Sequence, residues 1–176
     1  AGMLYFYATA YKCMPLLGNI IISALTALAI VLVVMPEPLA KEDATCVSFV
    51  TAYCVFSFLL TLVRELVKDM EDIAGDRSCG CTTLPVKAGT GITKALVILA
   101  TMSLVSVLAY IQILFKQWET PIPFWYLVIT VELPLIYLIP KVFRASERSH
   151  FTHISNIAKL IMFTGVLSMY IFHLAF

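Results

Sequence analysis

The chain has 176 residues, of which 61% are hydrophobic and only 13% are charged. Soluble globular domains are ~45–50% apolar and about 25% charged, so this composition excludes a soluble domain and predicts a polytopic membrane protein. The net charge of +1 comes without a basic stripe of the kind that binds nucleic acid, so we expect no nucleic-acid partner.

Long apolar runs mark the expected membrane spans, because about 20 apolar residues in a helix cross ~30 Å of hydrocarbon. Five such runs occupy residues 16–35, 45–63, 93–115, 124–140 and 154–176. We therefore expect an all-α transmembrane bundle that forms one membrane domain over residues 1–176. Residues 3–11 look like the end of a preceding helix, and the chain opens without methionine. These two features predict the C-terminal part of a longer protein.

The segments between the spans carry their own signals. The second span is expected to continue as a helix to about Ile73. Gly75, Gly80 and Pro85 then break the helical pattern, so residues 75–92 are predicted to form either a loop that orders on binding or a short interfacial helix. Residues 141–153 are predicted to form a basic loop.

The distribution of lysine and arginine predicts the orientation, because cytoplasmic loops carry an excess of these residues. When successive loops alternate between the two sides, ten of the twelve fall on one side: Lys12, Arg64, Lys68, Arg77, Lys87, Lys94, Lys141, Arg144, Arg148 and Lys159. We therefore expect an integral multi-pass membrane protein with the segment after the second span on the cytoplasmic side.

Acidic residues in that segment recur at helical spacing. They stand four, three and four residues apart, at Glu65, Asp69, Asp72 and Asp76. A helix of ~3.6 residues per turn would stack them on one face, where like charges repel unless a cation is shared. Carboxylates are hard oxygen donors suited to Mg²⁺, so Asp69, Asp72 and Asp76 are the candidate catalytic metal ligands.

Basic residues flank the carboxylates. Arg64, Lys68 and Arg77 would donate directly to a phosphate group. The alternative interpretation is a solvated, charge-balanced loop between two membrane helices. The helical spacing of the acids argues against this interpretation.

A metal and phosphate site at the mouth of an apolar bundle suits a substrate with a charged head and a long apolar tail. An isoprenyl diphosphate is such a molecule. Mg²⁺ would neutralise the charge on the departing pyrophosphate, and a lipid-enclosed chamber would keep water from the allylic cation.

Other polar residues leave alternatives open. Asn19, near a helix start, either caps or cross-links helices or touches substrate. Glu132 lies inside an apolar span before Pro134, where a carboxylate is either functional or a proton-bearing structural group. The five cysteines indicate neither a disulfide framework nor a zinc site, because Cys79-Gly-Cys81 lacks zinc-type spacing and has no histidine nearby.

The block RELVKDMEDIAGDRSCGCTTLP resembles the second aspartate-rich motif of the UbiA family of intramembrane prenyltransferases. That motif reads close to RE-x-x-KD-x-ED-x-x-GD followed by TLP, and the agreement runs without a gap from Arg64 to Pro85. The stretch YATAYKCMPLLGN, residues 7–19, is also similar to the segment before the family's fifth helix. Within the family, the chain looks most like geranylgeranylglycerol-phosphate geranylgeranyltransferases.

The resemblance implies a fold of nine helices, of which this chain would supply the end of helix 4 and helices 5 to 9. It implies that Asp69, Asp72 and Asp76 bind magnesium diphosphate, with help from Lys68, Arg77 and Lys12. The family's first motif, of the NDxxDxxxD type, is absent from these 176 residues, so we expect this polypeptide alone to be inactive.

The implied reaction is Mg²⁺-dependent transfer of a prenyl group from an isoprenyl diphosphate to a lipophilic or phosphorylated acceptor. Geranylgeranyl transfer to geranylgeranylglyceryl phosphate is the preferred interpretation. The enzymatic alternative is prenylation of an aromatic quinone precursor or haem by the same chemistry. Two other classes are a cation transporter, with the carboxylates and Glu132 as an ion path, and a non-catalytic membrane fragment.

Overall fold

A computed structural model describes residues 13–36, 44–114 and 121–175. All regular secondary structure in these three ranges is helical, which confirms the all-α class. The helix end expected over residues 3–11, and Lys12, lie outside them.

The helices follow one another along the chain with short connections. Their order is α2 (Leu17–Val34), α4 (Ala44–Glu71), α5 (Ile73–Ser78), α6 (Leu84–Ala88), α7 (Thr90–Leu114), α8 (Ile122–Leu127), the π-helical turn η2 (Val128–Glu132), α9 (Leu133–Arg144) and α10 (Arg148–Ala175). Within the described ranges, five helical stretches are long and apolar enough to cross a membrane. The five predicted spans are therefore confirmed, and the protein is an integral membrane protein.

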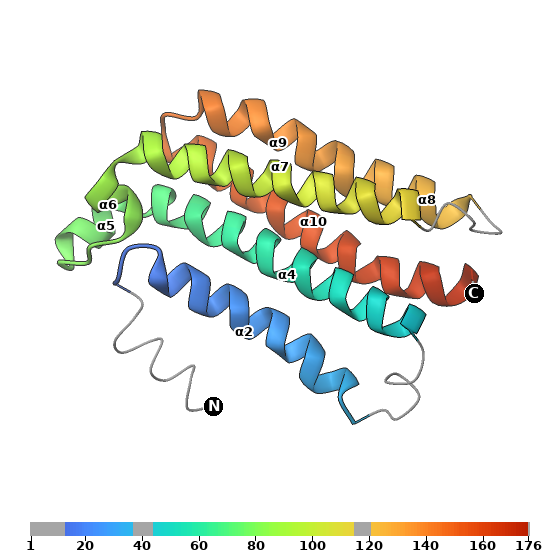
Figure 1. Cartoon of the computed structure of the whole chain (residues 1–176). Coiled ribbons are helices and arrows are strands. Elements are labelled where there is room, and N and C mark those ends of the chain that lie inside the picture. The colour runs from blue at the N-terminus through green and yellow to red at the C-terminus, as the bar shows by residue number, and fades with distance from the viewer. Residues whose placement is uncertain (1–12, 37–43, 115–120, 176) are drawn as a thin grey trace.

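Helix α4 is the centre of the bundle, with α2 on one side and α7 and α10 on the other (Figure 1). Its fully buried face carries Leu60, Val63 and Val67. Facing helices complete the core with Val97 and Leu104 from α7, Leu135 and Leu138 from α9, and Ile154 and Ile161 from α10. The two short helices α5 and α6 lie together at one end of the bundle, beside the end of α4.

The fourth span is one continuous run built from α8, η2 and α9. Pro134 has no N–H, so it cannot donate to the carbonyl of Thr130 four residues earlier. The Thr164 hydroxyl of α10 donates to that carbonyl at 3.1 Å. A threonine from a neighbouring helix thus satisfies the backbone group that the proline leaves without its usual partner.

Two connecting segments are more helical than an irregular loop. Residues 75–92 contain the last four residues of α5, all of α6 and the first turn of α7, in line with the short-helix alternative. The prediction of a basic loop over residues 141–153 is wrong for most of these residues, because only residues 145–147 separate α9 from α10. Lys141 and Arg144 fall in the last turn of α9, where cations interact favourably with the helix dipole.

Candidate functional site

The carboxylates occupy the junction between α4 and α5 rather than one continuous helix. α4 ends at Glu71, two residues before the expected end. Asp72 lies between the helices with φ −101° and ψ 11°, and Asp76 belongs to α5. The expected row on a single helix face is therefore broken at Asp72, although backbone bonds from Asp72 N to Lys68 O (3.0 Å) and from Asp76 N to Asp72 O (2.9 Å) continue the helical pattern.

Two of the three aspartates are oriented by neutral side chains. The amide of Asn19 on α2 donates from Nδ2 to Oδ2 of Asp69 at 2.8 Å. The Thr83 hydroxyl donates to Oδ2 of Asp76, also at 2.8 Å. Asn19 is 5% exposed and Thr83 is 4% exposed, so both donors are held in place by packing. Each carboxylate keeps further lone pairs, since an ionised carboxylate accepts about four hydrogen bonds.

Helix α10 approaches the same segment from the other side. Arg148 Nη2 lies 3.5 Å from Asp72 Oδ1, and the Thr152 hydroxyl donates to Glu71 Oε1 at 2.9 Å. Sequence reasoning missed Arg148, Thr152 and also Thr83 as members of this site. From the sequence, Arg148 contributed only to the predicted orientation in the membrane. Nothing in the sequence shows which loop cation pairs with which acid.

The predicted phosphate-binding cations are placed unequally. Arg64 pairs with its neighbour Glu65. Lys68 and Arg77 are exposed, and neither forms an ion pair with another described residue. Both are therefore accessible for an anionic ligand, whereas Arg64 already has a carboxylate partner. Lys12 lies outside the described residues.

A disulfide joins Cys13 to Cys81, with the two Cα atoms 4.6 Å apart. Thr82 reinforces this link, because its backbone N and its hydroxyl both donate to the Cys13 carbonyl at 3.1 Å. The expectation of no disulfide is therefore wrong at this pair. The two cysteines are 68 residues apart in sequence, and pairing over such a separation cannot be deduced from spacing.

The donor set fits Mg²⁺ by chemistry, because it consists of hard carboxylate oxygens. Among the residues that the structure describes, however, no three acidic, histidine or cysteine side chains converge as a metal-binding group. Asp69, Asp72 and Asp76 lie on successive segments that are each bound to a different neighbour: α2, α10 and the residue before α6. Magnesium binding therefore stays a proposal.

An apolar groove of about 370 Å³ runs between α2, α4 and α10. Its lining is largely hydrophobic, with hydroxyls at Thr26, Ser57 and Thr61, and Thr26 Oγ1 donates to Thr61 Oγ1 at 3.2 Å. Thr61 precedes Asp69 by eight residues, which is about 12 Å along a helix. Two side-chain hydrogen bonds between α2 and α4, Asn19 to Asp69 and Thr26 to Thr61, thus lie between the carboxylates and the groove.

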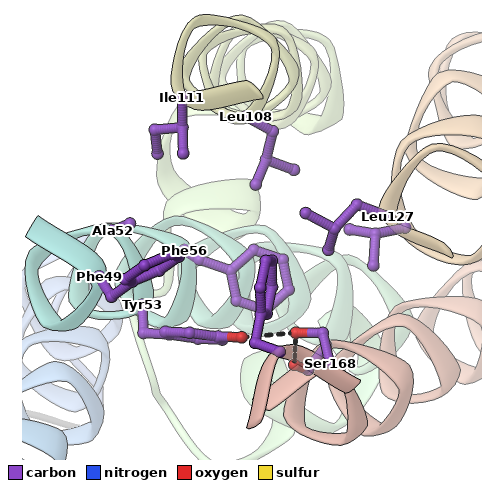
Figure 2. Close-up of a pocket in the computed structure, with 11 residues that line it drawn as sticks. Phe49, Ala52, Tyr53, Phe56, Leu108, Ile111, Leu127 and Ser168 are labelled. Atoms are coloured by element: carbon purple, nitrogen blue, oxygen red, sulfur yellow. Dashed lines mark hydrogen bonds between the residues drawn. The ribbon is translucent and has the colours of Figure 1, made fainter. Parts of the chain in front are cut away.

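A smaller cavity of about 40 Å³ lies beyond this groove, among α4, α7, α8 and α10. The Tyr53 hydroxyl forms a hydrogen bond with the Ser168 hydroxyl at 2.7 Å. Figure 2 shows this pair with the Phe56 ring beside it. Tyr53, Phe56 and Gly165 line both spaces. A Cβ at Gly165 would stand 2.6 Å from the Phe56 ring, so glycine is what lets this ring lie against α10.

Glu132 is hydrogen-bonded to a neighbouring helix inside the bundle. Gln112 of α7, which is 6% exposed, donates from Nε2 to Glu132 Oε1 at 2.7 Å. This partner agrees with the structural alternative for Glu132 and lies at the opposite end of α7 from the carboxylate segment. The acidic groups at the α4–α5 junction and Glu132 therefore do not form one site.

Comparison with known proteins identifies the class to which this architecture belongs. The chain belongs to the UbiA prenyltransferase family, whose model matches residues 1–165. It is 31% identical to the digeranylgeranylglyceryl phosphate synthase of Methanothermobacter thermautotrophicus over 164 residues, which are 91% of this chain and 53% of that protein.

Two further synthases with the same name show similar coverage. The Korarchaeum cryptofilum protein is 31% identical over 94% of this chain and 56% of its own length. The Thermococcus kodakarensis protein is 27% identical over 96% of this chain and 56% of its own length. The chain thus spans about half the length of these relatives. No solved structure matches it.

Proposed function

We propose that the complete protein transfers a geranylgeranyl group from its diphosphate to the free hydroxyl of geranylgeranylglyceryl phosphate. The observation that carries this proposal is an apolar groove between α2, α4 and α10 whose lining on α4 ends at Thr61. Thr61 lies eight residues, about 12 Å along a helix, before Asp69, the first of the three aspartates. The family and the names of the relatives support the same chemistry and this acceptor.

Asp69, Asp72 and Asp76 would hold Mg²⁺, which when bound neutralises the charge that develops on a departing diphosphate. Asn19 and Thr83 fix the orientation of two of these carboxylates. In the reaction, the bond between C1 of the prenyl group and the diphosphate oxygen breaks. The acceptor oxygen forms the new bond to C1, and its proton passes to the departing diphosphate.

Exposed cations next to the carboxylates suit the diphosphate itself. Lys68 and Arg77 are accessible and have no carboxylate partner among the described side chains. An arginine fork binds phosphate oxygens in pairs, while lysine acts as a point charge. We assign the same role to Arg64 and Lys12 in second place, because Arg64 is paired with Glu65.

The prenyl tail would lie in the groove between α2, α4 and α10. Sixteen residues separate Tyr53, at the far end of the groove, from Asp69, a distance of about 24 Å along α4. Along α4 the groove itself extends from Tyr53 to Thr61, so its apolar walls suit the distal isoprene units of an extended chain.

The decisive experiment measures prenyl transfer by the complete protein with radiolabelled geranylgeranyl diphosphate and Mg²⁺. Asp72→Asn is expected to abolish transfer to geranylgeranylglyceryl phosphate. Glu147→Gln is the matched control, because Glu147 is an exposed carboxylate in the turn between α9 and α10. Full activity of Asp72→Asn would remove that residue from the site. Transfer to an aromatic quinone precursor instead would reassign the acceptor but not the reaction.

We also propose that the carboxylate end of the bundle faces the cytoplasm, because it collects most of the lysines and arginines. Since the cytoplasm keeps thiols reduced, this orientation predicts that the Cys13–Cys81 disulfide opens in the cell. Cys79 is an exposed free thiol at this end. A membrane-impermeant maleimide should therefore label Cys79 in opened but not in intact cells. Labelling in intact cells would reverse the orientation.

A further inference from the structure

A second groove lies between α9 and α10. The connected ends of these two helices lie at the end of the bundle that carries α5 and α6 (Figure 1). Its volume is about 360 Å³, within the ~300–1,000 Å³ range of ligand sites. The side chains that give it its chemistry are Tyr137, Lys141, Arg144, His150, His153 and Ile154. No acidic residue is among the described residues that line it.

The lining arises from two helical stripes that face one another. Tyr137, Lys141 and Arg144 stand four and three residues apart on α9, so they share one face. His150 and His153 stand three residues apart on α10. Lys141 Nζ lies 5.2 Å from the centre of the Tyr137 ring, a cation–π distance that holds the ammonium group at the groove wall.

The cationic groups of this groove have no acidic partner among the residues that the structure describes. In the described ranges, neither Lys141 nor Arg144 forms an ion pair. His150 Nδ1 accepts a hydrogen bond from the Ser146 backbone N at 3.4 Å. With Nδ1 as the acceptor, the other ring nitrogen, Nε2, is the donor that this imidazole can offer a ligand.

This groove is separate from the carboxylate site. Arg148 and Thr152, on α10, contact the acids of that site, whereas His150 and His153 lie on the face of α10 that lines the groove. The helix therefore stands between the two. Isolated cations at the end of a membrane helix often only flank the bilayer, but here they share one concave surface with two imidazoles.

The surroundings indicate which kind of anion would occupy the groove. It lies at the ends of two membrane-spanning stretches, Ile122–Arg144 and Arg148–Phe172. Large apolar side chains on the same helices are exposed, including Ile136, Phe143 and Leu160. A ligand with a phosphate head and long apolar chains would contact both the cationic groove and the exposed apolar side chains. Basic pockets between membrane helices bind such head groups.

We propose that this groove binds the phosphate-bearing head group of an anionic membrane phospholipid. Lys141 and Arg144 contribute the charge, and His150 and His153 contribute hydrogen-bond donors. The lipid chains follow the exposed apolar flanks of α9 and α10. This binding site does not depend on the prenyl transfer proposed above.

The test is a lipid titration of the complete, delipidated protein followed by native mass spectrometry. Dioleoylphosphatidylglycerol should bind, and dioleoylphosphatidylcholine should bind much more weakly. A lysine or arginine near an anionic surface contributes about fivefold in affinity. The double variant Lys141→Gln/Arg144→Gln should therefore weaken phosphatidylglycerol binding by about 25-fold. The charge-keeping variant Lys141→Arg/Arg144→Lys should retain binding, which separates charge from folding.

The matched control is Lys87→Gln/Lys94→Gln, which removes two charges from α6 and α7 at the same end of the bundle. It should leave phosphatidylglycerol binding unchanged. Equal losses in the two glutamine variants would overturn the proposal, because binding would then reflect net charge alone. Equal binding of the two lipids would overturn it as well. A third arm with inorganic phosphate excludes a free-phosphate site if millimolar phosphate does not displace the lipid.

Discussion

Removing the amide of Asn19 should weaken catalysis by the complete protein without unfolding it. Asn19 donates to Asp69 at 2.8 Å and is 5% exposed, so water cannot easily replace it. A hydrogen bond to a charged group contributes about 1.5–3 kcal/mol, and each ~1.4 kcal/mol is tenfold in rate. Asn19→Ala is therefore expected to lower kcat by about 10- to 100-fold and to raise the Mg²⁺ concentration required.

The assay is prenyl transfer measured over a range of Mg²⁺ concentrations. Ser23→Ala is the control, because Ser23 is fully buried on the same helix and donates to the Asn19 carbonyl at 2.6 Å without touching an acid. Asn19→Asp should be more damaging than Asn19→Ala, since it faces Asp69 with a second carboxylate. The reasoning fails if Asn19→Ala keeps its Mg²⁺ dependence, or if Ser23→Ala loses activity equally.

Three further predictions concern packing and charge. Gly165→Ala should lower the thermal midpoint, because its Cβ would lie 2.6 Å from the Phe56 ring and overpacking costs about 1–3 kcal/mol; adding Phe56→Leu should restore the midpoint. In a double-mutant cycle of SDS-induced unfolding, Gln112→Leu and Glu132→Leu should couple by about 0.6–2 kcal/mol, and additive effects would contradict the 2.7 Å hydrogen bond. Arg148→Gln should change the free energy of unfolding by less than about 1 kcal/mol while raising KM for the prenyl diphosphate, and a stability loss with unchanged KM would contradict this.

The membrane spans could be predicted from the sequence because a bilayer forces long apolar runs into helices. The acids could also be predicted as a group, since their spacing is local. Their partners could not. Asn19 and Asp69 are 50 residues apart, and only the packing of α2 on α4 brings them together. The end of α4 before Asp72 could not be predicted either, because acids at helical spacing do not indicate where a helix ends.

The contacts of the three acids differ in a way that bears on how a diphosphate site would form. Asp69 is bound by a buried amide and Asp76 by a buried hydroxyl. Among the described side chains, Asp72 pairs only with Arg148, which is 75% exposed, at 3.5 Å. An ion pair this exposed contributes little, so Arg148 can leave the acid for a phosphate at small cost. Two acids are thus fixed before substrate arrives, while the one between them remains free to adjust.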